Sequence, residues 1–374
     1  MTLTDAAPTP LVDWSAAAQI AGRLARPGPA ASRTELDDLV ADLHAVASAA
    51  VPHVLRVTRM RVAPGPGADP GGPTSLGPVY VVDRVRWARA NTEIMAAMTA
   101  GLPGDHQAEA RGRRPRVSQA TALTGAAQVG AVLAALSSRV LGQFDPYSAP
   151  ESPGAGRLLL VAPNVLHVER ELELVPSDFR LWVALHEQTH ALQFSAAPWL
   201  ADHLRARATS LLADVTESSR RLTEARLRDR LTVAGRAVLG AVRGDGSSLL
   251  DGVLSPEQRH AVEEVSAVMA LLEGHADVAM DAVGPRTVRT VRQIRARFER
   301  RRDGAGSGTF DAVLRRLLGM DAKIAQYRDG AAFVRAVEKD VGRDGFNAVW
   351  AAPENLPTSR EIADARAWVR RVHG

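Results

Sequence analysis

The chain has 374 residues, 46% of them apolar and 24% charged, so it can bury the core of one large domain or of two smaller ones. It contains no cysteine, which excludes disulfide bonds, thiolate metal ligands and a cysteine nucleophile. Its formal net charge of +4 is a weak argument for a polyanionic partner. The N-terminal stretch lacks the basic and apolar segments of a secretory signal, so we expect a cytoplasmic protein.

Helical patterns separated by breaks dominate the first part of the chain. Helices are expected over residues 12–26, 32–57 and 83–98, and Ser32 is the expected N-cap of the second. Residues 64–78 are rich in proline and glycine, and residues 101–116 form a polar, arginine-containing stretch. Both segments are expected to be loops.

Two apolar segments follow these loops. The first, residues 118–141, is expected to be a helix, and its Ser, Thr and Gln side chains favour a buried bundle helix over a membrane span. The second, Gly154 to Pro163, contains LLLVA and is the best strand candidate, either a buried strand or an edge that pairs with an extended peptide. We expect an N-terminal helical region over 1–150 and a second region over 151–374, which form two domains or one integrated domain.

The stretch from Leu181 to Phe194, LWVALHEQTHALQF, contains the pattern H-E-x-x-H on an expected helix. Residues four apart on a helix are separated by about 40° of rotation, so His186 and His190 project from one face and can share a metal. Two imidazoles at this spacing suit Zn²⁺, and Glu187 can accept a proton from an activated water. The alternative is a surface helix with two solvated histidines, which the apolar flanks disfavour.

A second stretch, Leu271 to Asp281, supplies candidates for the third protein ligand that a catalytic zinc needs. On a helix, Glu273 and Asp277 lie about 40° apart, whereas His275 lies about 200° from Glu273. One face therefore presents two carboxylates. His275 remains an alternative ligand if the helix kinks at Gly274.

Several segments together resemble a zincin-like family of actinobacterial zinc-dependent metalloproteases, some members of which are associated by name with biosynthesis of a deazaflavin coenzyme. The segments are ERELELVPSDFRLWVALHEQTHALQF, LLEGHADVAMDAVGP, KIAQYRDGAAFVRAV and GFNAVWAAPENLPT. The resemblance extends from Val12 to Val369. It implies a hydrolase with a mainly α, zincin-like helical fold, and we expect a small β element beside the H-E-x-x-H helix.

The two central stretches also resemble the glutamate-zincin pattern, in which a glutamate from a second helix binds zinc. This resemblance implies that Glu273 is the third ligand and that Asp277, one turn later, accepts a hydrogen bond from His186 and fixes its tautomer. Glu273 follows His190 by 83 positions, a gap longer than in compact members of that class.

Two further features allow other interpretations. Tyr327 is either a donor to the oxyanion of an acyl-transfer intermediate or a structural tyrosine. The run from Arg286 to Arg302 is the strongest basic segment, but without interleaved aromatic residues or a reader motif it only weakly favours a nucleic-acid-binding helical protein.

We therefore expect a zinc metallohydrolase, a metallopeptidase or amide hydrolase that uses a metal-activated water on a peptide or small amide substrate. The second interpretation is a catalytically silent, zinc-stabilised binding or scaffold protein. Neither the particular substrate nor the oligomeric state is predicted.

Overall fold

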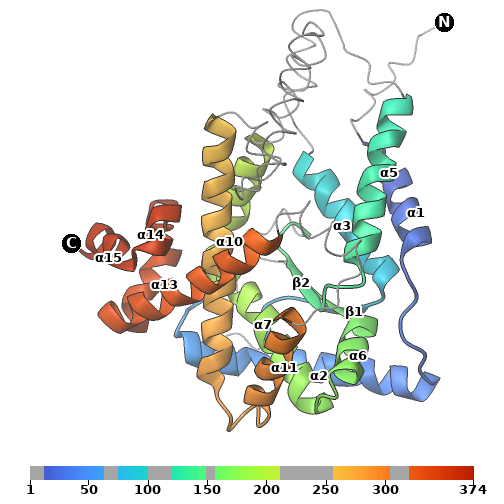
Figure 1. Ribbon diagram of the computed structural model, residues 1–374, viewed down its shortest axis with the longest axis horizontal. Coiled ribbons are helices and arrows are strands. Elements are labelled where there is room, and N and C mark those ends of the chain that lie inside the picture. Colours follow the sequence, from blue (N-terminus) through green and yellow to red (C-terminus); the bar gives the residue numbers. More distant parts are fainter. Residues whose placement is uncertain (1–11, 63–74, 100–118, 149–155, 211–255, 304–319) are drawn as a thin grey trace, which may run out of the picture. The chain divides into compact units, whose positions relative to one another are not determined.

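The computed structural model describes residues 12–62, 75–99, 119–148, 156–210, 256–303 and 320–374 (Figure 1). The chain divides into two compact units. Unit 1 comprises Met1–His53, Pro64–Ser195 and Pro285–Ile294, and unit 2 comprises Val54–Ala63, Ala196–Gly284 and Arg295–Gly374. The units interleave along the chain, and two of their boundaries fall inside helices α2 (Arg33–Thr58) and α11 (Val291–Asp303). The expected division into regions 1–150 and 151–374 stays a prediction.

The helices predicted near the N-terminus are confirmed. They are α1 (Trp14–Leu24), α2 and α3 (Arg84–Thr99). The backbone N–H of Glu35 donates to Ser32 Oγ at 3.2 Å, which is the predicted N-cap of α2. The predicted loop at 101–116 and most of the one at 64–78 lie outside the described residues.

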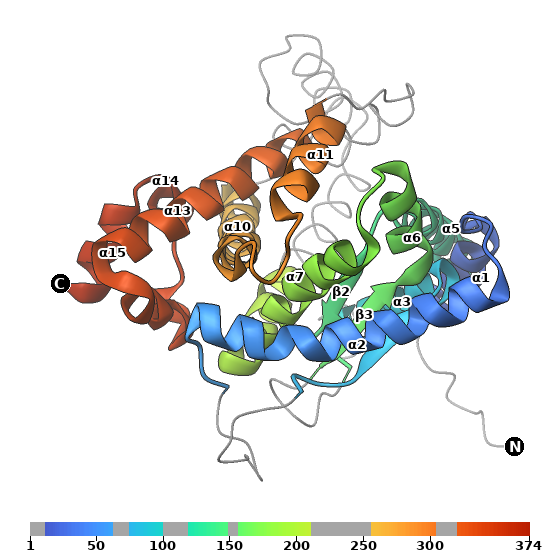
Figure 2. The same ribbon diagram turned by 90° about the horizontal axis from the view of Figure 1, so that it is seen from below.

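A mixed three-stranded sheet lies in unit 1 (Figure 2). It consists of β1 (Val79–Val82), β2 (Gly142–Asp145) and β3 (Arg157–Val161) in the order β1-β3-β2, with β1 parallel and β2 antiparallel to β3. The strand expected between Gly154 and Pro163 is β3, and its interpretation as an edge strand is wrong, because both of its sides are paired. The alternative, a buried strand, is confirmed, since residues 158–161 are buried.

Helices cover both faces of this sheet. On one face, Leu159 and Val161 of β3 share a core cluster with Ala21 of α1, residues of α3 and Leu133 of α5 (Gln119–Leu136). Successive side chains of a strand point to opposite faces. Phe144, paired with Leu158, accordingly faces the other side, toward α7 (Pro176–Ala196). This confirms a mainly α fold with a small β element beside the H-E-x-x-H helix.

Among the described residues, α5 is the single helix long and apolar enough to cross a membrane, and 28% of that window is buried. Gly130 lets α5 approach α1 closely, because a Cβ at this position would lie 2.9 Å from the carbonyl oxygen of Ala17. This face of α5 is therefore packed against another helix, whereas most of the helix is not buried. The helix ends at Leu136, earlier than expected, and Leu123 and Val132 are exposed.

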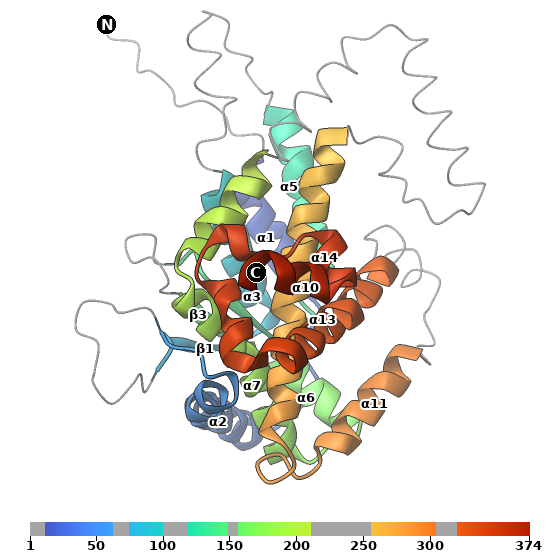
Figure 3. The ribbon, with the colours of Figure 1, turned by 90° about the vertical axis from the view of Figure 1, so that its left-hand side faces the viewer.

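Unit 2 is built around two crossing helices, α10 (Pro256–Val283) and α13 (Met320–Phe346) (Figure 3). A Cβ on Gly274 would lie 2.2 Å from the carbonyl carbon of Gly330, and a Cβ on Gly330 would lie 2.0 Å from Ala270 O, so the two backbones touch. Helix α10 runs unbroken through Gly274, and the kink considered for this position is absent. Gly274 therefore does not bend α10; because it has no side chain, α13 can cross α10 at close range.

The remaining described elements are short. Unit 1 also contains α6 (Ala162–Glu171), which directly follows β3. Unit 2 closes with the 3-10 turns η1 (Asn347–Trp350) and η2 (Pro353–Asn355) and the helices α14 (Ser359–Ala363) and α15 (Ala365–His373).

Candidate metal centre

The residues between Glu187 and His190, Gln188 and Thr189, are buried in unit 1, and Gln188 ties α7 to α2. Gln188 Nε2 donates to the carbonyl oxygen of Ala47 on α2 at 2.9 Å, and Thr189 Oγ1 donates to Leu185 O at 2.7 Å. Both side chains are buried. The face of α7 that carries these two side chains therefore points into the protein. His186 and His190 lie beside this face and are half-buried.

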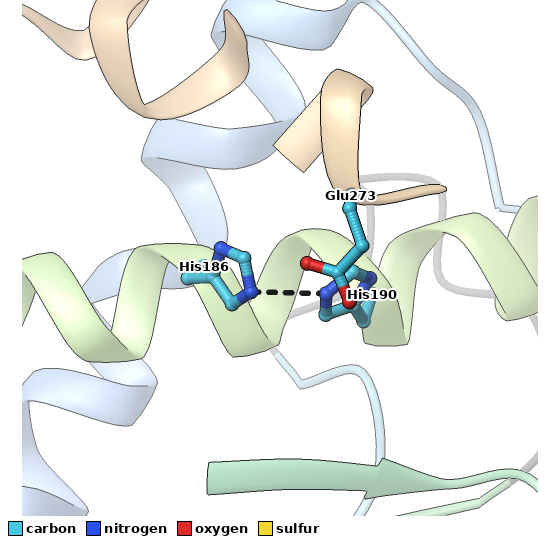
Figure 4. Close-up of side chains that lie close together, drawn as sticks. All are labelled: His186, His190 and Glu273. Carbon is cyan, nitrogen blue, oxygen red and sulfur yellow. Dashed lines mark hydrogen bonds between the residues drawn. The ribbon is translucent and has the colours of Figure 1, made fainter. Parts of the chain in front are cut away.

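His186 and His190 meet edge to edge on α7. Their Nε2 atoms lie 3.1 Å apart, and the ring planes are 89° apart (Figure 4). Zinc binds imidazole nitrogen at about 2.0–2.1 Å, so two nitrogens in a tetrahedral site are separated by about 3.3 Å. The observed separation therefore suits a shared Zn²⁺. The structure brings the two rings together as their spacing predicts, and their role as ligands stays a prediction.

Gln193 orients the second imidazole and had no place in the sequence-based prediction. Its Oε1 lies 2.9 Å from His190 Nδ1. An amide oxygen only accepts hydrogen bonds, so Nδ1 carries the proton and Nε2 keeps its lone pair. This is the tautomer that can bind a metal through Nε2. The i, i+3 spacing of the two residues on one helix was the available sequence signal.

Glu187 is buried, with 6% of its surface exposed, and its side chain lies over Gly142 of β2. A Cβ on Gly142 would lie 2.6 Å from Cγ, 2.7 Å from Cδ and 2.8 Å from Oε1 of Glu187. The carboxylate therefore occupies the space that any other residue at position 142 would fill.

The carboxylates of α10 differ in their surroundings. Glu273 is half-buried. Arg295 Nη1 donates to Asp277 Oδ1 at 2.9 Å and Nη2 donates to Asp277 O at 3.1 Å, while Arg295 Nε lies 2.6 Å from Asp281 Oδ1. Within unit 2, Asp277 is thus held by the guanidinium group of Arg295, which also reaches Asp281. The hydrogen bond expected between Asp277 and His186 stays a prediction.

His275 and Tyr327 are the other two candidates from the sequence. His275 has 2% of its surface exposed, and its ring centroid lies 5.3 Å from that of Phe346 and 5.3 Å from that of Trp350. Its role as a ligand stays a prediction. Tyr327 lies in α13, and its side chain is outside the described part of the chain.

A small cavity on the α3 side of the sheet is lined by polar residues that include Glu93, Asp145 and Arg157. Burial raises the pKa of Asp145, although the N–H of Tyr147 and Arg157 Nε donate to its carboxylate and oppose this shift. Asp145 and Phe144 are consecutive and point to opposite faces of the sheet. This cavity is therefore separated by the sheet from the face on which Glu187 lies.

One group of side chains among the described residues could hold a metal ion: His186, His190 and Glu273. The two imidazoles come from α7 of unit 1 and the carboxylate from α10 of unit 2. Two imidazoles and one carboxylate form a donor set that catalytic zinc sites use, with one position left for water or substrate. The donor chemistry of these residues therefore fits Zn²⁺.

The chain matches the zincin-like metallopeptidases over residues 12–369 and belongs to that family. It is similar to a protein from Chloroflexus aurantiacus whose crystal structure is described as that of a "putative hydrolase with a novel fold". The two share 29% sequence identity with a TM-score of 0.63, over 97% of this chain and 99% of the other. No curated protein matches the chain. The predicted resemblance is thus confirmed at the level of the zincin-like family.

Proposed function

We propose that the protein is a zinc-dependent peptidase or related amide hydrolase in which His186, His190 and Glu273 bind one Zn²⁺. The observation that carries this proposal is the pair of Nε2 atoms 3.1 Å apart, together with the contact between His190 Nδ1 and Gln193 Oε1, which leaves Nε2 as the ligand nitrogen of His190. The carboxylate of Glu273, which completes a donor set of two imidazoles and one carboxylate, and membership of a metallopeptidase family support it. When bound, Zn²⁺ supplies Lewis acidity, which polarises a carbonyl group and lowers the pKa of water.

Glu187 is the proposed general base. Amide hydrolysis requires that water lose a proton and that the leaving nitrogen gain one, and a single carboxylate can perform both transfers in turn. Glu187 follows His186 directly and is buried on the face of α7 that meets β2. The carboxylate accepts the proton of the attacking water at one oxygen and then donates it to the departing amine.

The proposed substrate is an extended peptide. β2 is an outer strand of the described sheet, and its first residue lies against Glu187. An outer strand can pair its main chain with an extended segment and so position a peptide bond independently of side chains. The resemblance to actinobacterial proteins associated with a deazaflavin coenzyme does not identify a substrate.

The metal assignment is tested by measuring the zinc content of the purified full-length protein and of its variants. We expect one equivalent of zinc in the wild type and in Glu187→Gln, and loss of zinc in His186→Ala and Glu273→Ala, because each of the latter removes one donor. Undiminished zinc in a folded Glu273→Ala variant would remove Glu273 from the site.

Turnover is tested with a library of synthetic peptides analysed by mass spectrometry. Zinc-loaded Glu187→Gln is expected to cleave about 10²- to 10⁴-fold more slowly than the wild type, because the amide cannot accept the proton of water. Unchanged cleavage by this variant contradicts the role of Glu187. A zinc-loaded wild type that cleaves no peptide favours the silent scaffold protein.

A further inference from the structure

Gly142 lies at a place where a side chain has no room. The three heavy atoms nearest to a Cβ at this position all belong to one residue: Cγ, Cδ and Oε1 of Glu187, at 2.6–2.8 Å. Ordinary van der Waals contacts of a Cβ begin at 3.4 Å. A residue other than glycine therefore requires either the strand or the carboxylate to move.

The strand is held at three points. Phe144 stacks on Phe194 of α7, with ring centroids 5.5 Å apart and planes 29° apart. Gln143 and Asn91 exchange two amide hydrogen bonds of 3.1 Å on the opposite face of the sheet. Gly142 itself is paired with Leu160 of the central strand. Moving β2 away from α7 breaks these contacts.

The carboxylate is the easier group to move. Phe194 follows Glu187 by two helical turns, about 10.5 Å along α7. The contact between Phe144 and Phe194 therefore stays in place while the Glu187 side chain changes its rotamer. A Cβ at position 142 would then be accommodated by a displacement of the carboxylate on the order of 1 Å, which is enough to reduce a rate about a hundredfold.

We propose that Gly142 is a positioning residue: because it has no side chain, the Glu187 carboxylate can occupy the space above β2 and stay in its reactive place. The catalytic part of this inference rests on the proposed role of Glu187 as general base. The steric part stands without it.

The steric part is tested by thermal unfolding of the full-length protein, which requires no substrate. We expect Gly142→Ala to lower Tm in the wild-type and Glu187→Gln backgrounds, because both side chains carry the three crowded atoms. In the Glu187→Ala background these atoms are gone, and Gly142→Ala should cost little. Gly130→Ala, which clashes with Ala17 on α1, is the matched control and should lower Tm equally in all backgrounds.

An equal loss of Tm from Gly142→Ala in the wild-type and Glu187→Ala backgrounds overturns the proposal. If Gly142→Ala does not fold, recovery of a folded protein in Gly142→Ala/Glu187→Ala supports it. Failure of both to fold overturns it as well. These outcomes are independent of whether the protein cleaves peptides.

The catalytic part is tested with the peptide library and the zinc-loaded variant. Gly142→Ala should retain one equivalent of zinc, since the substitution leaves both imidazoles in place, and kcat should fall about a hundredfold with KM little changed. Wild-type kcat in Gly142→Ala, together with an inactive Glu187→Gln, contradicts the positioning role. If Glu187→Gln is also fully active, the proposed function fails instead, and the thermal experiment still decides the steric contact.

Discussion

The helices α7 and α10 both carry histidines and carboxylates close together in sequence, but the structure surrounds these groups differently. On α7, the edges of His186 and His190 meet at 3.1 Å, and His190 bonds to the amide of Gln193. On α10, His275 is buried against the rings of Phe346 and Trp350. A second histidine four residues away on the same helix therefore distinguishes the candidate ligands of α7 from the buried His275 of α10.

The carboxylates show the same contrast. Glu187 on α7 lies over a strand position that has no side chain. Asp277 and Asp281 on α10 share Arg295. A carboxylate held by a guanidinium group has its oxygens occupied and is less available to a metal or an imidazole. Three substitution experiments test this comparison.

The largest effect is expected from the same substitution made in both helices. His190→Phe should abolish stoichiometric zinc binding, because the ring loses its donor nitrogen. His275→Phe should retain zinc, because phenylalanine preserves a ring against Phe346 and Trp350. Zinc content after dialysis gives the readout, and far-UV circular dichroism shows whether each variant is folded. Loss of zinc from a folded His275→Phe variant would show that His275 is a ligand, and the histidines of the two helices would then have the same role.

A smaller effect is expected from Gln193. Removing the partner of a metal-bound imidazole typically weakens metal binding 10–100-fold. Gln193→Ala should show a loss of this size in competition with a chromophoric chelator, because His190 Nδ1 loses its acceptor. Gln193→Glu keeps an acceptor oxygen and should bind zinc at least as tightly as the wild type. Equal affinities in all three proteins would show that Gln193 does not set the tautomer.

Local patterns in the sequence predicted the elements that depend on neighbouring residues. The N-cap at Ser32, the long helices and the apolar strand β3 each follow from a few consecutive side chains. The strand β2, GQFD, has no such pattern. It forms because Gly142 to Asp145 pair with β3 in the tertiary structure, and no pattern within these four residues predicts that pairing.

The same distinction applies to the candidate site. The pair at 186 and 190 depends on a spacing of four residues, and the bond from His190 to Gln193 on a spacing of three. The contact between Gly142 and Glu187 joins a strand to a helix far along the chain, and it requires the tertiary fold. The ion pair of Asp277 likewise requires that α11 return alongside α10. From the sequence, the basic run from Arg286 to Arg302 and the acidic stretch from Leu271 to Asp281 were two separate features, with no predicted contact between them.

The smallest expected effect decides between two roles for Asp277. If its function is to bind Arg295, Asp277→Asn should lower the free energy of unfolding by about 1 kcal/mol, as is typical of partly exposed ion pairs, with unchanged zinc affinity. If it instead orients His186, as the glutamate-zincin resemblance implies, zinc affinity should fall 10–100-fold.

Arg295→Met is the matched variant for this test, because methionine retains the apolar part of the side chain and removes the charge. In the ion-pair case, the double variant should be less destabilised than the sum of the single variants, since either substitution removes the same interaction. Arg295→Met alone should cost more than Asp277→Asn, because Arg295 also pairs with Asp281. Weakened zinc binding in Asp277→Asn but not in Arg295→Met would assign Asp277 to the metal centre, and the carboxylates of α10 would then act together.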